Sequence, residues 1–308
     1  MIEPIAMADK NVDKSKFDFL NSIPFILVHL TCFAVIWTGI SWFAALVCIG
    51  LYVIRMFAIT AFYHRYFSHR SYKTSRPVQF GMALLGSSAV QKGALWWAAH
   101  HRHHHRHSDT ENDIHSPGFQ GIWRAHVGWI TAKQWSDTNY EDIKDFTKFP
   151  ELVFLNKYYL LVPTMLACAC FGLGAFLEVH APSLQTSAMQ MLICGFFIST
   201  VLLYHGTFCI NSLCHLFGRK RYVTGDESRN SLILALITLG EGWHNNHHFY
   251  PGAERQGHYW WEIDISHYCL TVMSWFGLVW DLHKPPMEVM RAGQAKAIHA
   301  GVSNDFNT

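Results

Sequence analysis

Charged residues are scarce in this chain of 308 residues: only 15% of the residues are charged, whereas half are hydrophobic. This balance favours a membrane protein that also has a substantial polar part. The formal net charge is +2, and no basic stripe alternates with aromatic residues. Nucleic acid binding is therefore not predicted.

Motifs for thiol chemistry are also missing. The eight cysteines lie mostly inside apolar runs and form no Cys-x-x-Cys pair, so neither a disulfide framework nor a thiolate zinc or iron–sulfur site is expected. We interpret them as small hydrophobic residues. Residues 1–21 mix acidic and basic side chains without a small-residue cleavage site. This favours a short cytoplasmic lead over a cleaved signal peptide.

Long apolar runs predict an all-α integral membrane protein with four transmembrane helices in two hairpins. A span takes about 20 apolar residues, and the candidate spans are residues 23–37, 42–62, 158–177 and 189–210. Arg55 lies near the end of the second run and is expected to snorkel to the interface. We expect one domain over residues 1–308.

Basic residues indicate the orientation in the membrane. The connectors 38–41 and 179–187 contain no Lys or Arg, while basic residues collect at 65–76, 102–106 and 219–221. The positive-inside rule then places both termini and the histidine motifs in the cytoplasm. There, 63–157 and 211–290 would form a helical cap on the spans. Within this cap, 78–99 is expected to be one interfacial or buried helix, and 265–280 another.

Two histidine triplets share one helical spacing. His101, His104 and His105 occupy positions i, i+3 and i+4, and the spacing returns at His244, His247 and His248. Such residues share one face of a helix, so each triplet could aim three imidazoles at one point. Two triplets suggest two metal ions.

The other histidines carry weaker signals. His64 and His69 are five residues apart and cannot share a face of a regular helix, but they could reach one centre if the helix ends or distorts there. Isolated histidines in or near apolar runs favour a structural role: His29, His180, His205 and, by default, His215. The remaining residues of the first tract lie off its shared face, which favours a solvated position: His100, His103 and His107.

The ligand type limits the choice of metal. Imidazoles suit iron, zinc or copper, whereas structural zinc sites usually use several cysteines. An excess of His without Cys favours a site that keeps positions open for oxygen. Iron at a membrane face then predicts the oxidation of lipid.

Three of these segments resemble the histidine boxes of integral-membrane fatty-acid desaturases. The segments are His64-Arg-Tyr-Phe-Ser-His69, His101-Arg-His-His104-His105 and His244-Asn-Asn-His247-His248. The acyl-CoA Δ9 branch is the nearer match, because Asn211-Ser212-x-x-His215-Leu-Phe-Gly and Gly240-Glu-Gly-x-His244 are also similar to it. The resemblance covers roughly residues 20–285.

The resemblance implies a di-iron centre and an acyl substrate. Two iron ions would be held by His64, His69, His101, His104, His105, His215, His244, His247 and His248, with Asn211 contacting one metal through water. The implied reaction removes two hydrogens from a saturated acyl chain and reduces O2 to water, giving a cis double bond in unsaturated fatty acid biosynthesis. An unactivated C–H bond has no acidic proton that a base could remove, so the task of the protein is to position the acyl chain at the oxidant.

The implied acyl tunnel runs between the first hairpin and the later spans. Trp97 and Thr207 match family positions that line it, with plain packing as the alternative for the tryptophan. Tyr52 and Met56 precede His64 by about 18 and 12 Å along a helix. They could plug the methyl end of the tunnel or simply face lipid.

The acyl carrier and the electron donor stay open. Animal acyl-CoA members carry Arg-Asp where this chain has Ala99-His100, so the carrier could be CoA, a phospholipid or a carrier protein. The sequence contains no glycine-rich dinucleotide fingerprint and no fused cytochrome b5-like His-Pro-Gly-Gly segment. A separate donor is therefore implied, such as ferredoxin or cytochrome b5 with its reductase, docking on the basic face.

Two rival functions remain. A membrane di-iron hydroxylase of alkanes or lipids shares the boxes but yields an alcohol. A histidine-based metal transporter would need a polar path, and the four candidate spans contain few polar residues.

Overall fold

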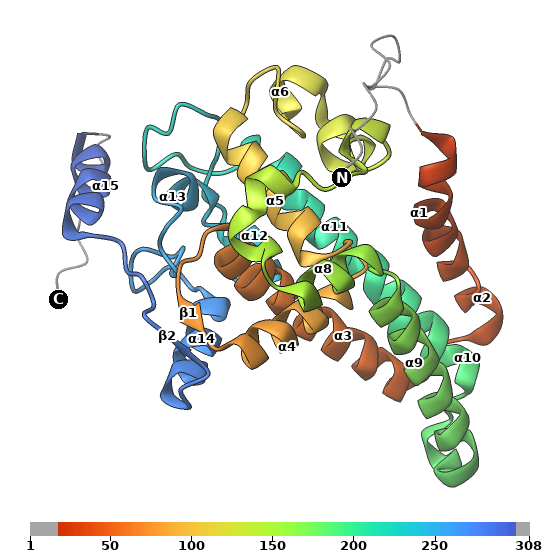
Figure 1. The fold of residues 1–308 in the computed structure, drawn as a ribbon. Coiled ribbons are helices and arrows are strands. Elements are labelled where there is room, and N and C mark those ends of the chain that lie inside the picture. The colour runs from red at the N-terminus through yellow and green to blue at the C-terminus, as the bar shows by residue number, and fades with distance from the viewer. Residues whose placement is uncertain (1–17, 300–308) are drawn as a thin grey trace, which may run out of the picture.

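The computed structural model describes residues 18–299, which are mostly helical (Figure 1). The expected lead at 1–21 thus lies largely outside the described residues. The first half of the described chain contains α1 (Phe19–Cys32), α2 (Val35–Thr38), α3 (Trp42–Phe57), η1 (Ala58–Ser68), β1 (Lys73–Thr74), α4 (Arg76–Ser87), α5 (Ala94–His107), α6 (Pro117–Gln120), η2 (Arg124–Gly128), η3 (Lys133–Trp135), η4 (Tyr140–Ile143), α7 (Lys144–Thr147) and α8 (Pro150–Lys157).

The second half is helical as well. It contains α9 (Leu161–His180), η5 (Pro182–Leu184), α10 (Ala188–Gln190), η6 (Met191–Ile198), α11 (Ser199–Ser212), η7 (Leu213–His215), α12 (Leu232–Ile237), α13 (His244–Phe249), α14 (Ile265–Trp275), β2 (Val279–Trp280) and α15 (Met287–His299). The two short strands pair antiparallel, with Lys73 opposite Trp280. This pairing fastens the C-terminal region to the end of η1.

Within residues 18–299, three continuous helical stretches are long and apolar enough to cross a membrane: Trp42–Ser68, Leu161–His180 and Ala188–His215. They correspond to the second, third and fourth predicted spans. The first predicted span forms the shorter apolar helix Ser22–Thr38, which is interrupted between α1 and α2. The all-α class with several apolar spans is confirmed, while the first segment covers the predicted 23–37 but is shorter than the other three helical stretches.

Arg55 does not reach the interface. It is fully buried on α3, and its guanidinium donates to Ser199 Oγ, to Thr200 Oγ1 at 2.8 Å and to the carbonyl of Ser88 at 3.3 Å. The snorkelling prediction was wrong because α3 packs against η6 and α11. These elements provide polar partners inside the bundle.

The predicted helix over 78–99 is two helices, α4 and α5, joined by the loop 88–93. Val90 and Lys92 in this loop have positive φ angles of 60° and 61°. Positive φ angles are uncommon for residues other than glycine, especially for the β-branched Val90, and mark a tightly determined backbone. The loop matters below because it carries Gln91.

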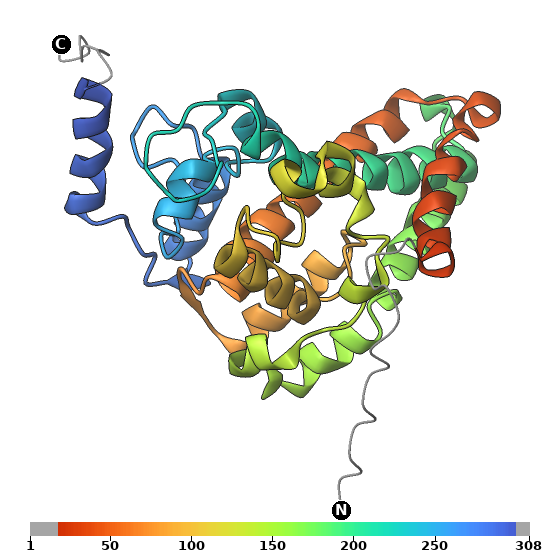
Figure 2. The same cartoon turned by 90° about the horizontal axis from the view of Figure 1, so that it is seen from above.

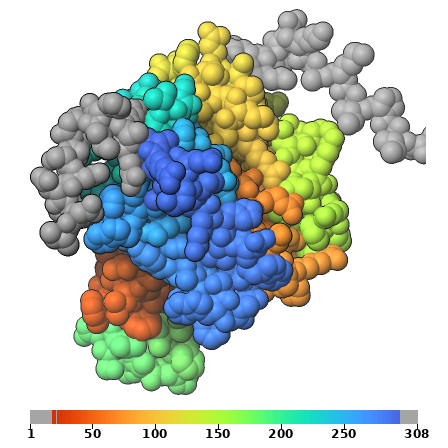
Figure 3. Space-filling view, turned by 90° about the vertical axis from the view of Figure 1, so that its left-hand side faces the viewer, coloured from red at the N-terminus to blue at the C-terminus, as the bar shows by residue number. Residues whose placement is uncertain are grey.

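The largest hydrophobic cluster surrounds η1 and includes residues of α4, α5 and α8. Figure 2 shows the C-terminal segments (blue) on one side of this core and α1 (red) on the other. The C-terminal segments also cover one face of the molecule in Figure 3, above the green end of α9. The core thus fixes η1 and α5 against each other, and both elements carry predicted metal ligands.

Candidate metal centre

The spacing of His64 and His69 is explained by a π-helix. Residues 58–68 form η1, and the backbone N–H of His69 donates to the carbonyl of His64 at 3.3 Å. This i→i+5 bond widens the turn, so residues five apart come onto one face. The centroids of the two rings are 5.0 Å apart. The distortion that the pair required is therefore present.

The nine predicted histidines meet in two groups of converging ring nitrogens. The nitrogens within each group lie within 4.8 Å of one another. Five residues form the first group, namely His64, His69, His101, His105 and His247, and four form the second, namely His104, His215, His244 and His248. Either group could hold a metal ion.

The sequence pattern suggested that each triplet forms one group, but both triplets are divided between the two groups. In α5, His101 and His105 join the group of five whereas His104 joins the group of four; in α13, His247 joins the five whereas His244 and His248 join the four. Two centres lie where α5 and α13 approach each other, and each helix directs an i, i+4 pair to one centre and a single histidine to the other. The prediction that each triplet aims at one point was wrong.

The close approach of these nitrogens fits a cation. His247 Nε2 lies 3.0 Å from His64 Nε2 and 2.9 Å from His105 Nε2. Each neutral imidazole has one lone pair and one N–H, so clustered acceptor nitrogens repel unless a positive charge lies among them. His104 and His248 each have a buried Nε2 without a hydrogen-bond partner. The residues present therefore fit metal ions.

The protonation state also suits ligation. Burial, followed by the neighbouring imidazoles, lowers the pKa of His69, His101 and His105 well below the ordinary value. Burial likewise lowers the pKa of His248 to about 4, although Asp226 opposes the shift. These rings are neutral at physiological pH, as metal binding requires.

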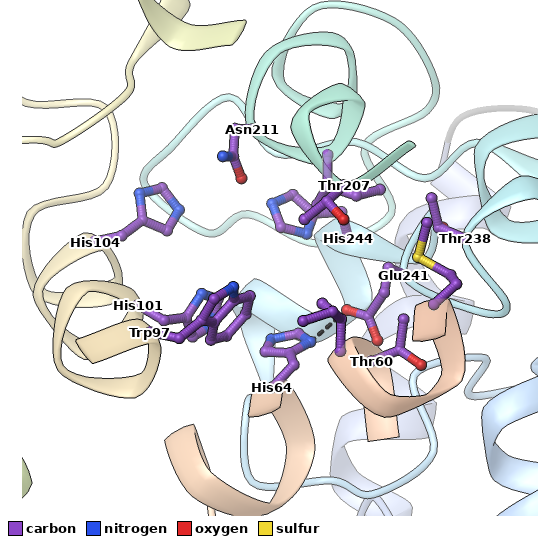
Figure 4. Close-up of a pocket in the computed structure, with 13 residues that line it drawn as sticks. Thr60, His64, Trp97, His101, His104, Thr207, Asn211, Thr238, Glu241 and His244 are labelled. Carbon is purple, nitrogen blue, oxygen red and sulfur yellow. Dashed lines mark ion pairs between the residues drawn. The ribbon is translucent and has the colours of Figure 1, made fainter. Parts of the chain in front are cut away.

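Carboxylates orient four of the imidazoles. The Nδ1–H groups of three of them donate to carboxylates at 2.7–2.8 Å: His104 to Asp113, His215 to Asp109 and His248 to Asp226. Glu241 pairs with His64 Nδ1 (Figure 4). A carboxylate on one nitrogen fixes the tautomer and turns the other nitrogen towards the metal.

Arg65 anchors this system from behind. It is fully buried and pairs with Glu241 and Asp264. Asp264 in turn caps α14 by accepting the backbone N–H of His267. His64 is thus connected through Glu241 to a buried ionic network that joins η1 to the C-terminal region.

Other histidines have different roles. His115, which received no role from the sequence, is buried beside His104 and Asp113, and no pattern in the sequence singles it out. His100 is buried and contacts the Trp96 carbonyl at 2.8 Å, so the solvated position predicted for it was wrong. His29 and His205 contact each other at 3.2 Å, as expected of hydrogen-bonded histidines.

A small cavity of about 40 Å³ lies against the histidines. Figure 4 shows Asn211 on the side of His104 and His244, while Trp97 and Thr207 face the same space. Gln91, missed by the sequence analysis, donates to Thr207 Oγ1 at 3.0 Å and accepts from Trp97 Nε1 at 3.3 Å. These contacts tie the loop 88–93 to α5 and α11.

The two suggested plug residues differ in position. Met56 is 1% exposed and lines the cavity, so the lipid-facing alternative does not hold for it. Tyr52 does not line the cavity; its hydroxyl donates to the Ile237 carbonyl at 2.8 Å. Both side chains pack against Gly206.

Comparison with known proteins agrees with this geometry. Residues 40–268 match the family model described as fatty acid desaturase. The chain belongs to the fatty acid desaturase family. It is a fatty acyl desaturase, an oxidoreductase of lipid metabolism, with histidine clusters that can hold metal.

Three relatives illustrate the range of this family. The desaturase is 33% identical to the sn-1 stearoyl-lipid 9-desaturase of Anabaena variabilis, with 86% of this chain and 93% of the relative covered. It is 32% identical to the acyl-CoA 5-desaturase AL21 of Anemone leveillei (85% and 78% covered). It is also 31% identical to the hex-5-enoyl-[acyl-carrier protein] acetylenase of Moorena producens (92% and 90% covered).

Proposed function

We propose that this desaturase introduces a cis double bond at the Δ9 position of a saturated fatty acyl chain, carried as acyl-CoA or acyl-lipid. The observation that carries the proposal is the convergence of nine imidazole rings in groups of five and four. The Δ9 position rests on the sn-1 stearoyl-lipid 9-desaturase among the relatives. Because another relative is named as a 5-desaturase, the double-bond position is a more specific claim than desaturation itself.

The nine histidines would hold two iron ions, with Asn211 contacting the ion of the four-histidine group through water. Bound iron would supply, with O2, the oxidising chemistry that an unactivated C–H bond requires. Asp109, Asp113, Asp226 and Glu241 keep the ring nitrogens oriented. The role of these carboxylates would be to fix the orientation of the imidazole rings.

The positioning of the acyl chain would fall to residues around the cavity. Gln91, Trp97 and Thr207 form a hydrogen-bonded group that can define a bend beside the histidines. Met56, supported by Tyr52 and Gly206, would close the methyl end. The distance from the closed end of the cavity to the histidines would then determine which two carbons react. Holding these carbons in a fixed position contributes several kcal/mol to such reactions.

Electrons would come from a separate donor, such as ferredoxin or cytochrome b5 with its reductase. We expect the histidine groups and the termini on the cytoplasmic side, since the basic residues at 65–76, 102–106 and 219–221 neighbour the histidine segments in the sequence. An acidic donor could dock on this face. Single-domain organisation over 1–308 is part of the same proposal.

Expression in a host that lacks monounsaturated lipids tests the proposal. Mass spectrometry of derivatised fatty acids should detect a cis alkene at position 9. An alcohol in its place would indicate the hydroxylase alternative. Metal uptake without any oxidised lipid would favour the transporter.

A further inference from the structure

A second, larger cavity of about 400 Å³ leads from the histidines to two apolar helices. Its inner end shares Trp97, His101, Thr207 and Asn211 with the small cavity at the metal centre. Its volume falls in the range of small-molecule sites, about 300–1,000 Å³. The two cavities therefore form one route to the histidines.

The outer end of this larger cavity is lined by α1 and α9. Phe25 and Val28 come from α1, and Pro163, Thr164 and Cys168 come from α9. Thr164 and Cys168 are exposed and Phe25 is half-buried, so this end forms a mouth on the surface. α9 is one of the apolar helices long enough to span a membrane. The mouth therefore faces hydrocarbon.

The depth of the mouth suits the upper part of an acyl chain. Thr164 and Cys168 lie three and seven residues after Leu161, the first residue of α9, or roughly 5 and 10 Å along the helix axis. A hydrocarbon core is about 30 Å thick. The mouth is thus close to the N-terminal end of α9, on the side of the membrane where we expect the histidine groups.

The charges around this cavity do not suit a polyphosphate carrier. Among the described residues 18–299 that line it, Lys92 is the only Lys or Arg. Its ammonium group donates to the Ser136 carbonyl at 2.7 Å and lies 4.6 Å from the centre of the Trp96 ring. The walls formed by the described part of the chain thus offer no cluster of cations to a soluble, multiply charged carrier.

A shallow groove continues from the mouth along the junction of α8 and α9. It shares Tyr159, Leu160 and Thr164 with the cavity and adds Lys157 and Tyr158. Lys157 is exposed and lies 5.2 Å from the centre of the Tyr158 ring. Tyrosines and a lysine at this depth are typical of the lipid headgroup region, where a cation attracts phosphate.

We propose that the acyl chain enters sideways from the bilayer, between α1 and α9, while it is still part of a membrane phospholipid. The phosphate lies in the groove at Lys157, and one acyl chain turns through the mouth towards Trp97 and Thr207. This inference rests on the proposed desaturase function and selects the acyl-lipid form of its substrate.

Photo-crosslinking tests this route without relying on turnover. The full chain is placed in nanodiscs with a diacyl phosphatidylglycerol that carries a diazirine in the middle of one acyl chain. Peptide mass spectrometry should locate crosslinks at Trp97 or Thr207, inside the protein. Ala167→Trp and, independently, Thr164→Trp should reduce these interior crosslinks at least tenfold by filling the mouth.

Met165→Trp is the matched control, because Met165 is 62% exposed on the same helix and does not line the cavity. It should leave the interior crosslinks unchanged. Retained metal content and a monodisperse elution profile show that each variant is folded. Equal interior crosslinking in all variants, or interior crosslinks from an acyl-CoA probe alone, would overturn the inference.

Single turnover of the reduced, iron-loaded protein separates this inference from the proposed function. Stearoyl phosphatidylglycerol should be desaturated, and Ala167→Trp should lower its yield at least tenfold. Desaturation of stearoyl-CoA alone would overturn the lipid route but preserve the proposed function. Interior crosslinks without an alkene from either substrate would contradict the proposed function while the route stands.

Discussion

His104 and His105 are adjacent in the sequence, yet their imidazoles belong to different nitrogen groups. Their ring centroids are 5.6 Å apart. His104 groups with His215, His244 and His248, whereas His105 groups with His64, His69, His101 and His247. One turn of α5 thus contributes to both groups. The pair connects the two proposed iron sites through a single backbone segment.

Replacing either residue should therefore damage a different site. His104→Ala and His105→Ala should each lower desaturation by more than about 100-fold, since outer-sphere partners alone are worth about 10–100-fold in affinity or activity. His103→Ala is the control, because His103 contacts the Asn112 carbonyl outside both groups. Iron per chain and alkene yield are measured together. Full activity in His105→Ala would remove it from the ligand set.

Asp226 orients His248 through a hydrogen bond of 2.7 Å. Burial opposes ionisation of Asp226, but the bond from His248 outweighs it and holds the pKa of Asp226 below its ordinary value. Asp226→Asn should weaken iron binding about 10–100-fold. Metal titration measures the change, with Glu227→Gln as the neighbouring, exposed control. Equal affinities in the two variants would exclude an orienting role.

Gly206 and Met56 provide opposite changes at the closed end of the cavity. A Cβ on Gly206 would lie 2.8 Å from Met56 Cε and 2.9 Å from Tyr52 Oη. Gly206→Ala should push the flexible Met56 into the cavity and favour shorter chains, whereas Met56→Ala should admit longer ones. Competition among saturated substrates of graded length measures both. Gly50→Ala on α3 is the control and should leave the preferred chain length unchanged, because a Cβ there meets no atom within 4 Å. A shift of the preferred chain length in the same direction in Gly206→Ala and Met56→Ala would contradict this arrangement.

Arg55 supports the strained loop that holds Gln91. In Arg55→Met the Thr200 hydroxyl keeps its bond to the Phe196 carbonyl, but the Ser88 carbonyl loses its side-chain donor. The loop should loosen, and the product should become a mixture of double-bond positions at unchanged iron content. Arg76→Met, which breaks an exposed pair with Glu151, is the control. A single product position in Arg55→Met would refute this role.

Lys92 predicts a pH dependence of stability. Burial lowers its pKa from 10.5 to about 8, so between these values the unfolded chain binds more protons and stability rises with pH. The unfolding free energy of the wild type relative to Lys92→Met should increase by about 1–2 kcal/mol over this window, because partial exposure reduces the full shift. Unfolding in detergent across this range tests it, with the exposed Lys133→Met as reference. A difference that stays constant with pH would contradict the assignment.

The sequence predicted which histidines come together better than how they divide into groups. Helical spacing identified the histidines of α5 and α13, and apolar runs located three of the helices. The π-helix at His64 and the division of each triplet depend on packing between distant elements, which local periodicity does not report. Asp109, Asp113 and Asp226 could not be chosen in advance, because loop carboxylates are common and only the folded chain brings these three to the histidines.

Anomalous scattering at the iron edge, collected from the iron-loaded protein, tests the central claim most directly. Two separate peaks are expected, one among the nitrogens of His64, His69, His101, His105 and His247 and the other among those of His104, His215, His244 and His248. A single peak, or iron bound away from these histidines, would contradict the account.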